Sequence, residues 1–282
     1  MAMASMIYSV DAQSFVDNRK VLQQYAASVD SMLLKTKSIS ADQAKEALLT
    51  PSQTIKLNLQ KPRKKALTPA AIYASAKPAT VIMATAYLCN HCEHTHVSEA
   101  SGYVIDPTGI VVTNFHVVRA FVSITEANRG SAFVARLADG RTYPVKSVLT
   151  VSEENDLAIV QLDTHGEQLP SLALADKADV GDKAFVLGHP QNMHYVFTQG
   201  NVIHKEIEHF DFKQNGSYDR NTMLISADYA VGSSGGPVID ERGNIIGTVS
   251  STKTLTHSEQ NPSVQMVLKK TIPVESLWKL LK

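Results

Sequence analysis

Three residues of different types, far apart in the chain, could together cleave an acyl bond. His116 lies in the stretch VVTNFHVV, Asp156 begins DLAIVQL, and Ser234 lies in the glycine-rich stretch GSSGGPVID. Serine-based hydrolysis needs a nucleophilic hydroxyl, a histidine that accepts its proton, an acid that orients the histidine, and amide donors for the oxyanion. Each residue alone also fits an ordinary role, because the chain has 10 histidines and both Asp156 and Ser234 lie beside turns. Their joint order favours the catalytic interpretation.

The elements that must position these residues are mostly short strands. From about residue 68 onward, runs rich in Val, Ile, Thr, Tyr and Phe alternate with turn signals such as DPTG, ADG and ERGN. Twelve such runs, among them TVIMATAYL, GIVVTN and KAFVLG, carry no helical crossovers between them. This pattern predicts an all-β fold of antiparallel barrels or a sandwich.

The first part of the chain has a helical pattern instead. Apolar residues recur at helical spacing between Asp11 and Lys35, and SADQ offers Ser40 and Gln43 as a capping box for a second helix. We therefore expect residues 1–64 to form a helical extension that ends in the basic linker KPRKK, and residues 65–282 to form the main domain. VESLWKLL predicts a C-terminal helix. Helices lying over the active site could also hold the protein latent.

Composition narrows the partners. Lys+Arg and Asp+Glu both number 27, so nothing predicts a polyanionic partner such as nucleic acid. No stretch is long and apolar enough for a membrane-spanning helix, and no signal peptide is evident. The two cysteines do not indicate the cellular compartment of the protein. A periplasmic or secreted protein is expected if a signal peptide was removed, and a cytoplasmic one otherwise. No feature of the sequence predicts an oligomeric state.

Three segments in their order along the chain resemble the trypsin-like serine peptidases, and most of all their HtrA-type branch. They are SGYVIDPTGIVVTNFHVV, DLAIVQL and GSSGGPVID. The resemblance covers about residues 68–282 and implies a chymotrypsin-like double antiparallel β-barrel. It implies a serine endopeptidase that acts on proteins or peptides with no cofactor for catalysis. The alternative is a catalytically silent, peptide-binding scaffold of the same fold.

The resemblance also assigns roles to individual residues. It implies that His116 is the general base, Asp156 its orienting acid and Ser234 the nucleophile, with the amides of Gly232 and Ser234 as the oxyanion hole. Ser250, in TVSST, matches the serine that supports the buried acid.

The chain departs from the family pattern in two places. Ser233 stands where the family commonly has Asp or Asn, so activation by capture of a new N-terminus is not expected. Residues 1–282 do not predict the C-terminal PDZ domain that HtrA-type proteases usually carry, so the resemblance does not extend to HtrA-type regulation and assembly.

Asp228, six residues before Ser234, stands at the offset where trypsin carries the acid that receives Arg or Lys. A buried carboxylate there would favour basic substrates and would predict self-cleavage in KPRKK. HtrA relatives carry a nearby aspartate with a structural role, which is the alternative.

A second group of reactive side chains lies in CNHCEHTH. Cys89, Cys92, His94 and His96 could supply four donors for a structural zinc ion, because alternate residues of an extended segment share a face. A disulfide between Cys89 and Cys92, or two thiols in a surface loop, are the alternatives. No HExxH motif predicts a catalytic zinc.

Overall fold

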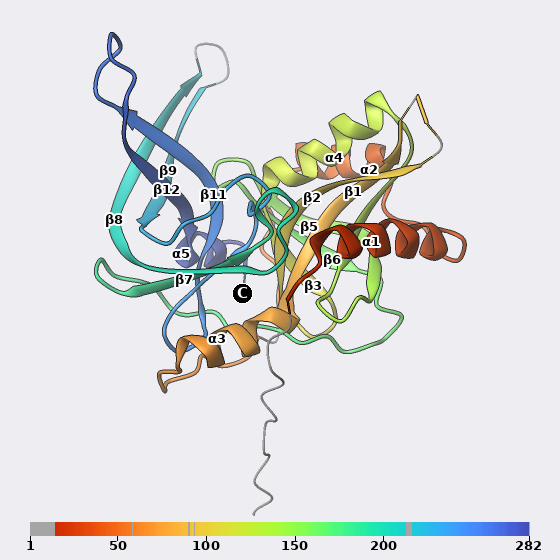
Figure 1. Ribbon diagram of the computed structural model, residues 1–282, viewed down its shortest axis with the longest axis horizontal. Coiled ribbons are helices and arrows are strands. Elements are labelled where there is room, and N and C mark those ends of the chain that lie inside the picture. The colour runs from red at the N-terminus through yellow and green to blue at the C-terminus, as the bar shows by residue number, and fades with distance from the viewer. Residues whose placement is uncertain (1–14, 58, 90, 93, 213–215, 282) are drawn as a thin grey trace, which may run out of the picture.

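Two closed β-barrels lie side by side and make up most of the protein (Figure 1). The computed structural model describes residues 15–281, except 58, 90, 93 and 213–215. In this part of the chain, each barrel contains six antiparallel strands. The predicted all-β, chymotrypsin-like double barrel is thereby confirmed.

The first barrel is closed in the order β1-β2-β3-β6-β5-β4. Its strands are β1 (Thr80–Leu88), β2 (Thr95–Asp106), β3 (Ile110–Thr113), β4 (Arg129–Arg136), β5 (Thr142–Ser152) and β6 (Leu157–Leu162). Most residues of β1, β3 and β6 are buried, which explains why these strands read as continuous runs of Val, Ile and Ala.

The second barrel is closed in the order β10-β11-β12-β9-β8-β7. Its strands are β7 (Lys183–Gly188), β8 (Val196–Phe212), β9 (Gly216–Ile225), β10 (Pro237–Ile239), β11 (Ile245–Thr256) and β12 (Val264–Pro273). The first half of β11 is buried and its second half is exposed. The hairpins β8–β9 and β11–β12 therefore extend beyond the barrel, at the upper left of Figure 1.

Helices α1 (Asn18–Leu33) and α2 (Ala41–Leu49) pack on the first barrel. Helix α1 contacts β2 and β5, and the hydroxyl of its fully buried Tyr25 donates to the carbonyl of Ile82 at 3.0 Å. Helix α2 begins with the predicted capping box of Ser40 and Gln43. The expected helix from residue 11 begins only at Asn18, and residues 11–14 lie outside the described part. None of the helices in the described ranges could cross a membrane.

The structure also contains helices that the sequence analysis did not predict. They are α3 (Pro69–Ala76) and α4 (Phe115–Ala127), together with the 3-10 turns η1 (Lys77–Ala79) and η2 (Pro190–Asn192). Helix α4 is rich in β-branched residues, which favour strands, so its segment carries a weak helical signal. Its apolar side nevertheless buries Val118, Phe121 and Val122, and this packing overrides the local preference. The predicted C-terminal helix is present as α5 (Val274–Trp278).

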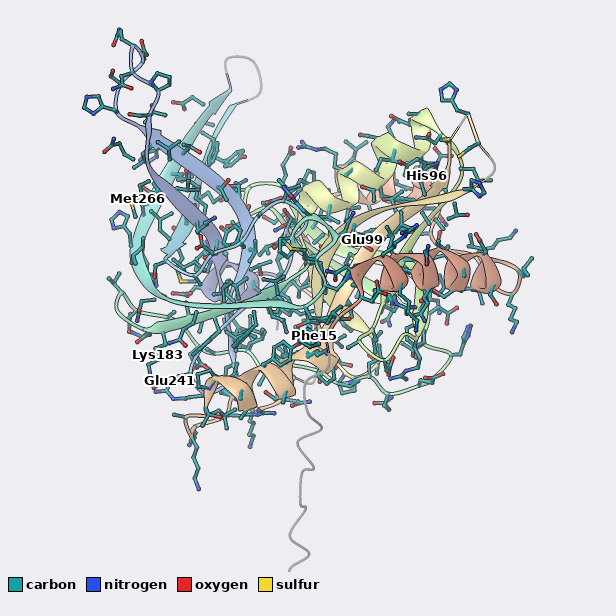
Figure 2. All side chains as sticks on the ribbon, in the orientation of Figure 1. Phe15, His96, Glu99, Lys183, Glu241 and Met266 are labelled. Carbon is teal, nitrogen blue, oxygen red and sulfur yellow. The ribbon has the colours of Figure 1, made fainter. Side chains whose placement is uncertain are left out.

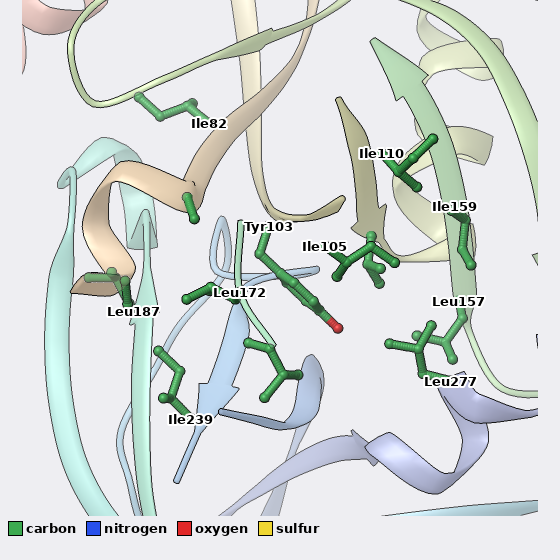
Figure 3. Close-up of a cluster of buried hydrophobic side chains, with 14 of the residues drawn as sticks. Ile82, Tyr103, Ile105, Ile110, Leu157, Ile159, Leu172, Leu187, Ile239 and Leu277 are labelled. Carbon is green, nitrogen blue, oxygen red and sulfur yellow. The ribbon is translucent and has the colours of Figure 1, made fainter. Parts of the chain in front are cut away.

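Of the three hydrophobic clusters in the described residues, one contains residues of both barrels (Figure 3). Tyr103 and Ile159 enter it from the first barrel, Leu187 and Ile239 from the second, and Leu277 from α5. All five side chains are at most 1% exposed. The barrels are therefore joined by a shared core, with a pocket at their junction.

Candidate active site

His116 and Asp156 lie together in the first barrel. His116 is in the first turn of α4, and Asp156 is in the turn that precedes β6. Nδ1 of His116 is 3.0 Å from both carboxylate oxygens of Asp156, and the His116 amide donates to Oδ1 at 3.1 Å. A carboxylate at Nδ1 fixes the tautomer that leaves Nε2 free to accept a proton.

Asp156 lies in a polar but nearly closed environment, with 10% of its side chain exposed. Ser250 on β11 donates to Oδ2 at 2.6 Å, and the side chain of Asn114 donates to the Asp156 carbonyl at 2.8 Å. Burial acts to raise the pKa of Asp156, but the hydrogen bonds from His116 and Ser250 outweigh it and lower the pKa. The carboxyl group is therefore held as an anion beside the imidazole.

Ser234 lies in the second barrel and faces the same pocket as His116. The pocket has a volume of about 170 Å³. Its lining is Ala84, Thr85, Ser98, Glu99, Ala100, His116, Val117, Ala120, Ile124, Val231, Gly232 and Ser234. The Ser234 hydroxyl makes a long hydrogen bond of 3.4 Å to the carbonyl of Ser250, and none to His116. Catalytic hydrogen bonds are often loose without substrate and tighten when it binds.

The backbone around Ser234 is shaped by two glycines. Gly232 has φ of 98°, and a Cβ there would lie 2.4 Å from the carbonyl oxygen of His189. Gly235 has φ of 82°, and a Cβ there would lie 2.3 Å from the carbonyl oxygen of Ser101. Only glycine fits both the conformation and the space. Within the described chain, the amides of Gly232 and Ser234 donate to no other residue, so both are available to a ligand.

Two supporting residues were not identified from the sequence. The Ser101 hydroxyl on β2 donates to the Gly232 carbonyl at 2.9 Å and accepts from the His189 amide at 3.2 Å. His189 is fully buried behind this loop, and burial lowers its pKa to about 3, assisted by the charge of His194. No local pattern could reveal such contacts, since Ser101 and Gly232 are 131 residues apart.

Glu99 is a third such residue. Its side chain, on β2, is fully buried against His194, with 3.0 Å between Oε2 and Nε2. The amide of His194 in turn donates to Asn18 Oδ1 at 2.9 Å, at the start of α1. Figure 2 shows Glu99 where β2 passes close to that end of α1. The start of the N-terminal helix is thus connected to the pocket wall through His194 and Glu99, although the helix itself does not line the pocket.

The structure does not bring Asp228, the predicted specificity residue, into the pocket, and Ser233, which departs from the family pattern, also lies outside it. Ser233 is 1% exposed and packs against Gly188. The Asp228 side chain is 84% exposed, with its carboxylate 3.3 Å from Lys269 Nζ. The hypothesis of basic-residue specificity requires a buried carboxylate at a pocket floor, and this placement does not provide one.

In CNHCEHTH, the structure brings three of the four predicted ligands together. The donor atoms of Cys89, Cys92 and His96 all lie within 4.8 Å of one another. The contact with Cys92 lowers the pKa of the Cys89 thiol to about 7. His94 does not join this group, because β2 begins only at Thr95 and the alternation expected for His94 and His96 does not extend to His94.

Comparisons with known proteins agree with this fold. The model of the trypsin-like peptidase domain matches residues 100–247. A Synechocystis sp. protein with the name "Putative serine protease HhoA" is 33% identical over 159 residues, which cover 55% of this chain and 37% of the relative. The chloroplastic Protease Do-like 5 of Arabidopsis thaliana is 29% identical over 192 residues, which cover 63% of this chain and 54% of the relative.

A solved structure, described as the crystal structure of Deg5, matches the fold with a TM-score of 0.54 at 21% identity. The match covers 74% of this chain and 90% of that one. The chain spans about half or less of the length of the two curated relatives above. The family model covers more than half of the chain and contains His116, Asp156 and Ser234. This protein therefore belongs to the trypsin-like serine peptidase family, in its HtrA-type branch.

Proposed function

We propose that this protein is a serine endopeptidase that hydrolyses peptide bonds through Ser234, His116 and Asp156. The observation that carries the proposal is the geometry of His116. Its Nδ1 is 3.0 Å from the Asp156 carboxylate, and its ring lines the same pocket as Ser234. The serine proteases among the relatives support the reaction class, and members of this family need no cofactor for catalysis.

In the proposed reaction, Ser234 Oγ attacks the carbonyl carbon of the scissile bond while His116 Nε2 accepts the hydroxyl proton. The amides of Gly232 and Ser234 donate to the resulting oxyanion. His116 then gives the proton to the leaving amine, and an acyl-enzyme forms. A water molecule, deprotonated by His116, releases the acyl group and restores Ser234. Asp156 stays ionised throughout and stabilises the imidazolium.

Labelling with a fluorophosphonate probe tests this proposal. The wild type should be labelled covalently, and Ser234→Ala should not. Ser98→Ala is a matched control, because Ser98 is an exposed serine that lines the same pocket. It should label like the wild type. A folded wild type that never labels would overturn the proposal in favour of a catalytically silent, peptide-binding scaffold.

A further inference from the structure

The Cys89, Cys92 and His96 group lies at the loop end of the β1–β2 hairpin, away from the proposed chemistry. Sγ of Cys92 is 3.2 Å from Sγ of Cys89 and 3.0 Å from Nε2 of His96. All three side chains are half-buried. Cysteine sulfur and histidine nitrogen are the donors that protein zinc sites use, so the group is a candidate metal site.

The hairpin itself holds the three side chains in place. Cys89 follows the last residue of β1, and the strand pairing sets His96 directly opposite Tyr87. The two rings stack with centroids 5.4 Å apart, which fixes the direction of the imidazole. On the same strand, the Thr95 hydroxyl donates to Asp30 of α1 at 2.7 Å. The site is therefore supported by residues that are not ligands themselves.

The donor set selects the class of ion. Thiolate and imidazole ligands suit zinc, whereas magnesium and calcium prefer oxygen. A tetrahedral zinc ion, with bonds of about 2.3 Å to sulfur and about 2.0 Å to nitrogen, separates its donors by roughly 3.5–3.8 Å. The distances from Cys92 Sγ to Cys89 Sγ and His96 Nε2, 3.2 Å and 3.0 Å, are slightly shorter, so a small shift of Cys92 away from both reaches this spacing. A disulfide would join Cys89 and Cys92 but would give no role to the nitrogen of His96.

We propose that Cys89, Cys92 and His96 bind a zinc-class divalent cation, which cross-links the hairpin at its loop end. Figure 2 shows His96 near this end and Glu99 further along the same strand, toward the centre of the molecule. From His96, β2 continues through residues 98–100, which line the candidate active-site pocket, to Ser101, which binds the loop of Gly232. The cation therefore fixes one wall of that pocket from outside it.

Cobalt provides the direct test, because Co²⁺ in a tetrahedral site with thiolate ligands absorbs strongly in the visible and near-ultraviolet regions. The full-length wild type, reduced and treated with chelator, should bind about one equivalent of Co²⁺ with such a spectrum. Zn²⁺ should displace the cobalt and abolish the absorption. A reduced wild type that shows no saturable binding of either metal overturns the proposal, whether or not a disulfide forms in air.

Variants identify the ligands. Cys92→Ser and His96→Gln should each reduce the affinity for Co²⁺ by at least tenfold, since one of three protein ligands is lost. His94→Gln and the distant, exposed His165→Gln serve as matched controls and should retain the spectrum. Loss of the spectrum in His94→Gln but not in His96→Gln would contradict the assignment. If a variant does not fold, the wild-type titration still decides whether a site exists.

Amide hydrogen exchange tests the effect on the pocket wall. Zn²⁺ should slow the exchange of residues 95–101 several-fold in the wild type and should leave it unchanged in His96→Gln. Equal exchange with and without Zn²⁺ in a wild type that binds the metal would refute the cross-link. Fluorophosphonate labelling should persist in His96→Gln, so the outcome is independent of the proposed peptidase chemistry.

Discussion

The hydroxyl of Ser101 in the first barrel donates to the carbonyl of Gly232 in the second barrel at 2.9 Å. The Ser101 amide also donates to the carbonyl of Ser234 at 2.8 Å. Strand β2 thus holds the backbone on both sides of Ser233. These bonds fix the two peptide planes that flank the Ser233–Ser234 peptide, and the Ser234 amide between them is one of the proposed oxyanion donors. The proposed oxyanion hole is shaped by a residue from the other barrel.

Ser101→Ala should therefore reduce kcat about tenfold and leave KM nearly unchanged. The variant removes one hydrogen bond to a loop that acts in the transition state, a loss of about 1–1.5 kcal/mol. Steady-state kinetics on a peptide substrate would measure the two constants. Ser98→Ala, a change of the same type on the same strand, should leave both constants unaltered. An increase in KM alone would show that Ser101 supports substrate binding instead.

Asp156→Asn should lower kcat by about 10⁴-fold, because an amide cannot hold the imidazole in the tautomer needed for a base. Asp228→Asn is the matched control. Since the Asp228 side chain is 84% exposed, we expect no change in its rate on substrates with Arg or Lys before the scissile bond. The basic-residue hypothesis would instead be supported if Asp228→Asn selectively lost cleavage after Arg or Lys. The KPRKK linker would then be cut in the wild type and stay intact in Asp228→Asn.

Gly232→Ala should reduce kcat by about 10²–10³-fold, because the new Cβ meets the carbonyl of His189 and displaces an oxyanion donor. Gly166→Ala separates this effect from backbone strain. Gly166 has φ of 88°, but nothing lies within 4 Å of a Cβ built there. The Gly166→Ala variant should have a lower Tm in thermal melts and an unchanged kcat. Equal kcat in both variants would argue against an oxyanion role for Gly232.

His189 should make the fold sensitive to mild acid. Its pKa falls from 6.5 in the unfolded chain to about 3 in the folded one, so between these values the unfolded state binds a proton that the folded state does not. The contribution of His189 to the free energy of unfolding is fully present above pH 6.5 and is lost as the pH falls toward 3. The loss is about 1.6 kcal/mol between pH 6.5 and pH 5.

Urea unfolding at a series of pH values would measure this loss. His189→Asn should flatten the pH dependence by that amount, whereas the exposed His165→Asn should not. Parallel curves for the wild type and His189→Asn would show that the pKa of His189 does not differ between the folded and unfolded states.

Removal of residues 1–64 should destabilise the protein rather than activate it. Tyr25 is fully buried in the core and no described residue of α1 or α2 lines the pocket, so the truncation exposes the first barrel without opening the site. A lower Tm with no gain in kcat is expected. Tyr25→Ala should cost about 3–5 kcal/mol in urea unfolding, and Phe15→Ala, at a fully exposed position, almost nothing. Higher activity in a folded truncation would restore the latency hypothesis.

Local features of the site and fold were accessible from the sequence, and long-range ones were not. The strand TVIMATAYL and the capping box of Ser40 depend on neighbouring residues and could be identified from them. Helix α4 was missed because its β-branched residues favour strands and only its packing makes it helical. The hydrogen bond between Ser101 and Gly232 joins residues of different barrels that belong to no shared sequence motif, so the sequence does not predict it. The roles of His116, Asp156 and Ser234, and the boundary after residue 64, stay predictions.

The hydrophobic cluster shared by the two barrels couples their unfolding. Residues such as Leu187 and Tyr103 lose their burial if either barrel separates, so the halves should melt in a single cooperative transition. Independent barrels joined by a flexible hinge would let His116 and Ser234 drift relative to each other. Here the shared core fixes the distance between His116 and Ser234 when the chain folds. A substrate therefore binds to a pocket whose two sides already have their final positions.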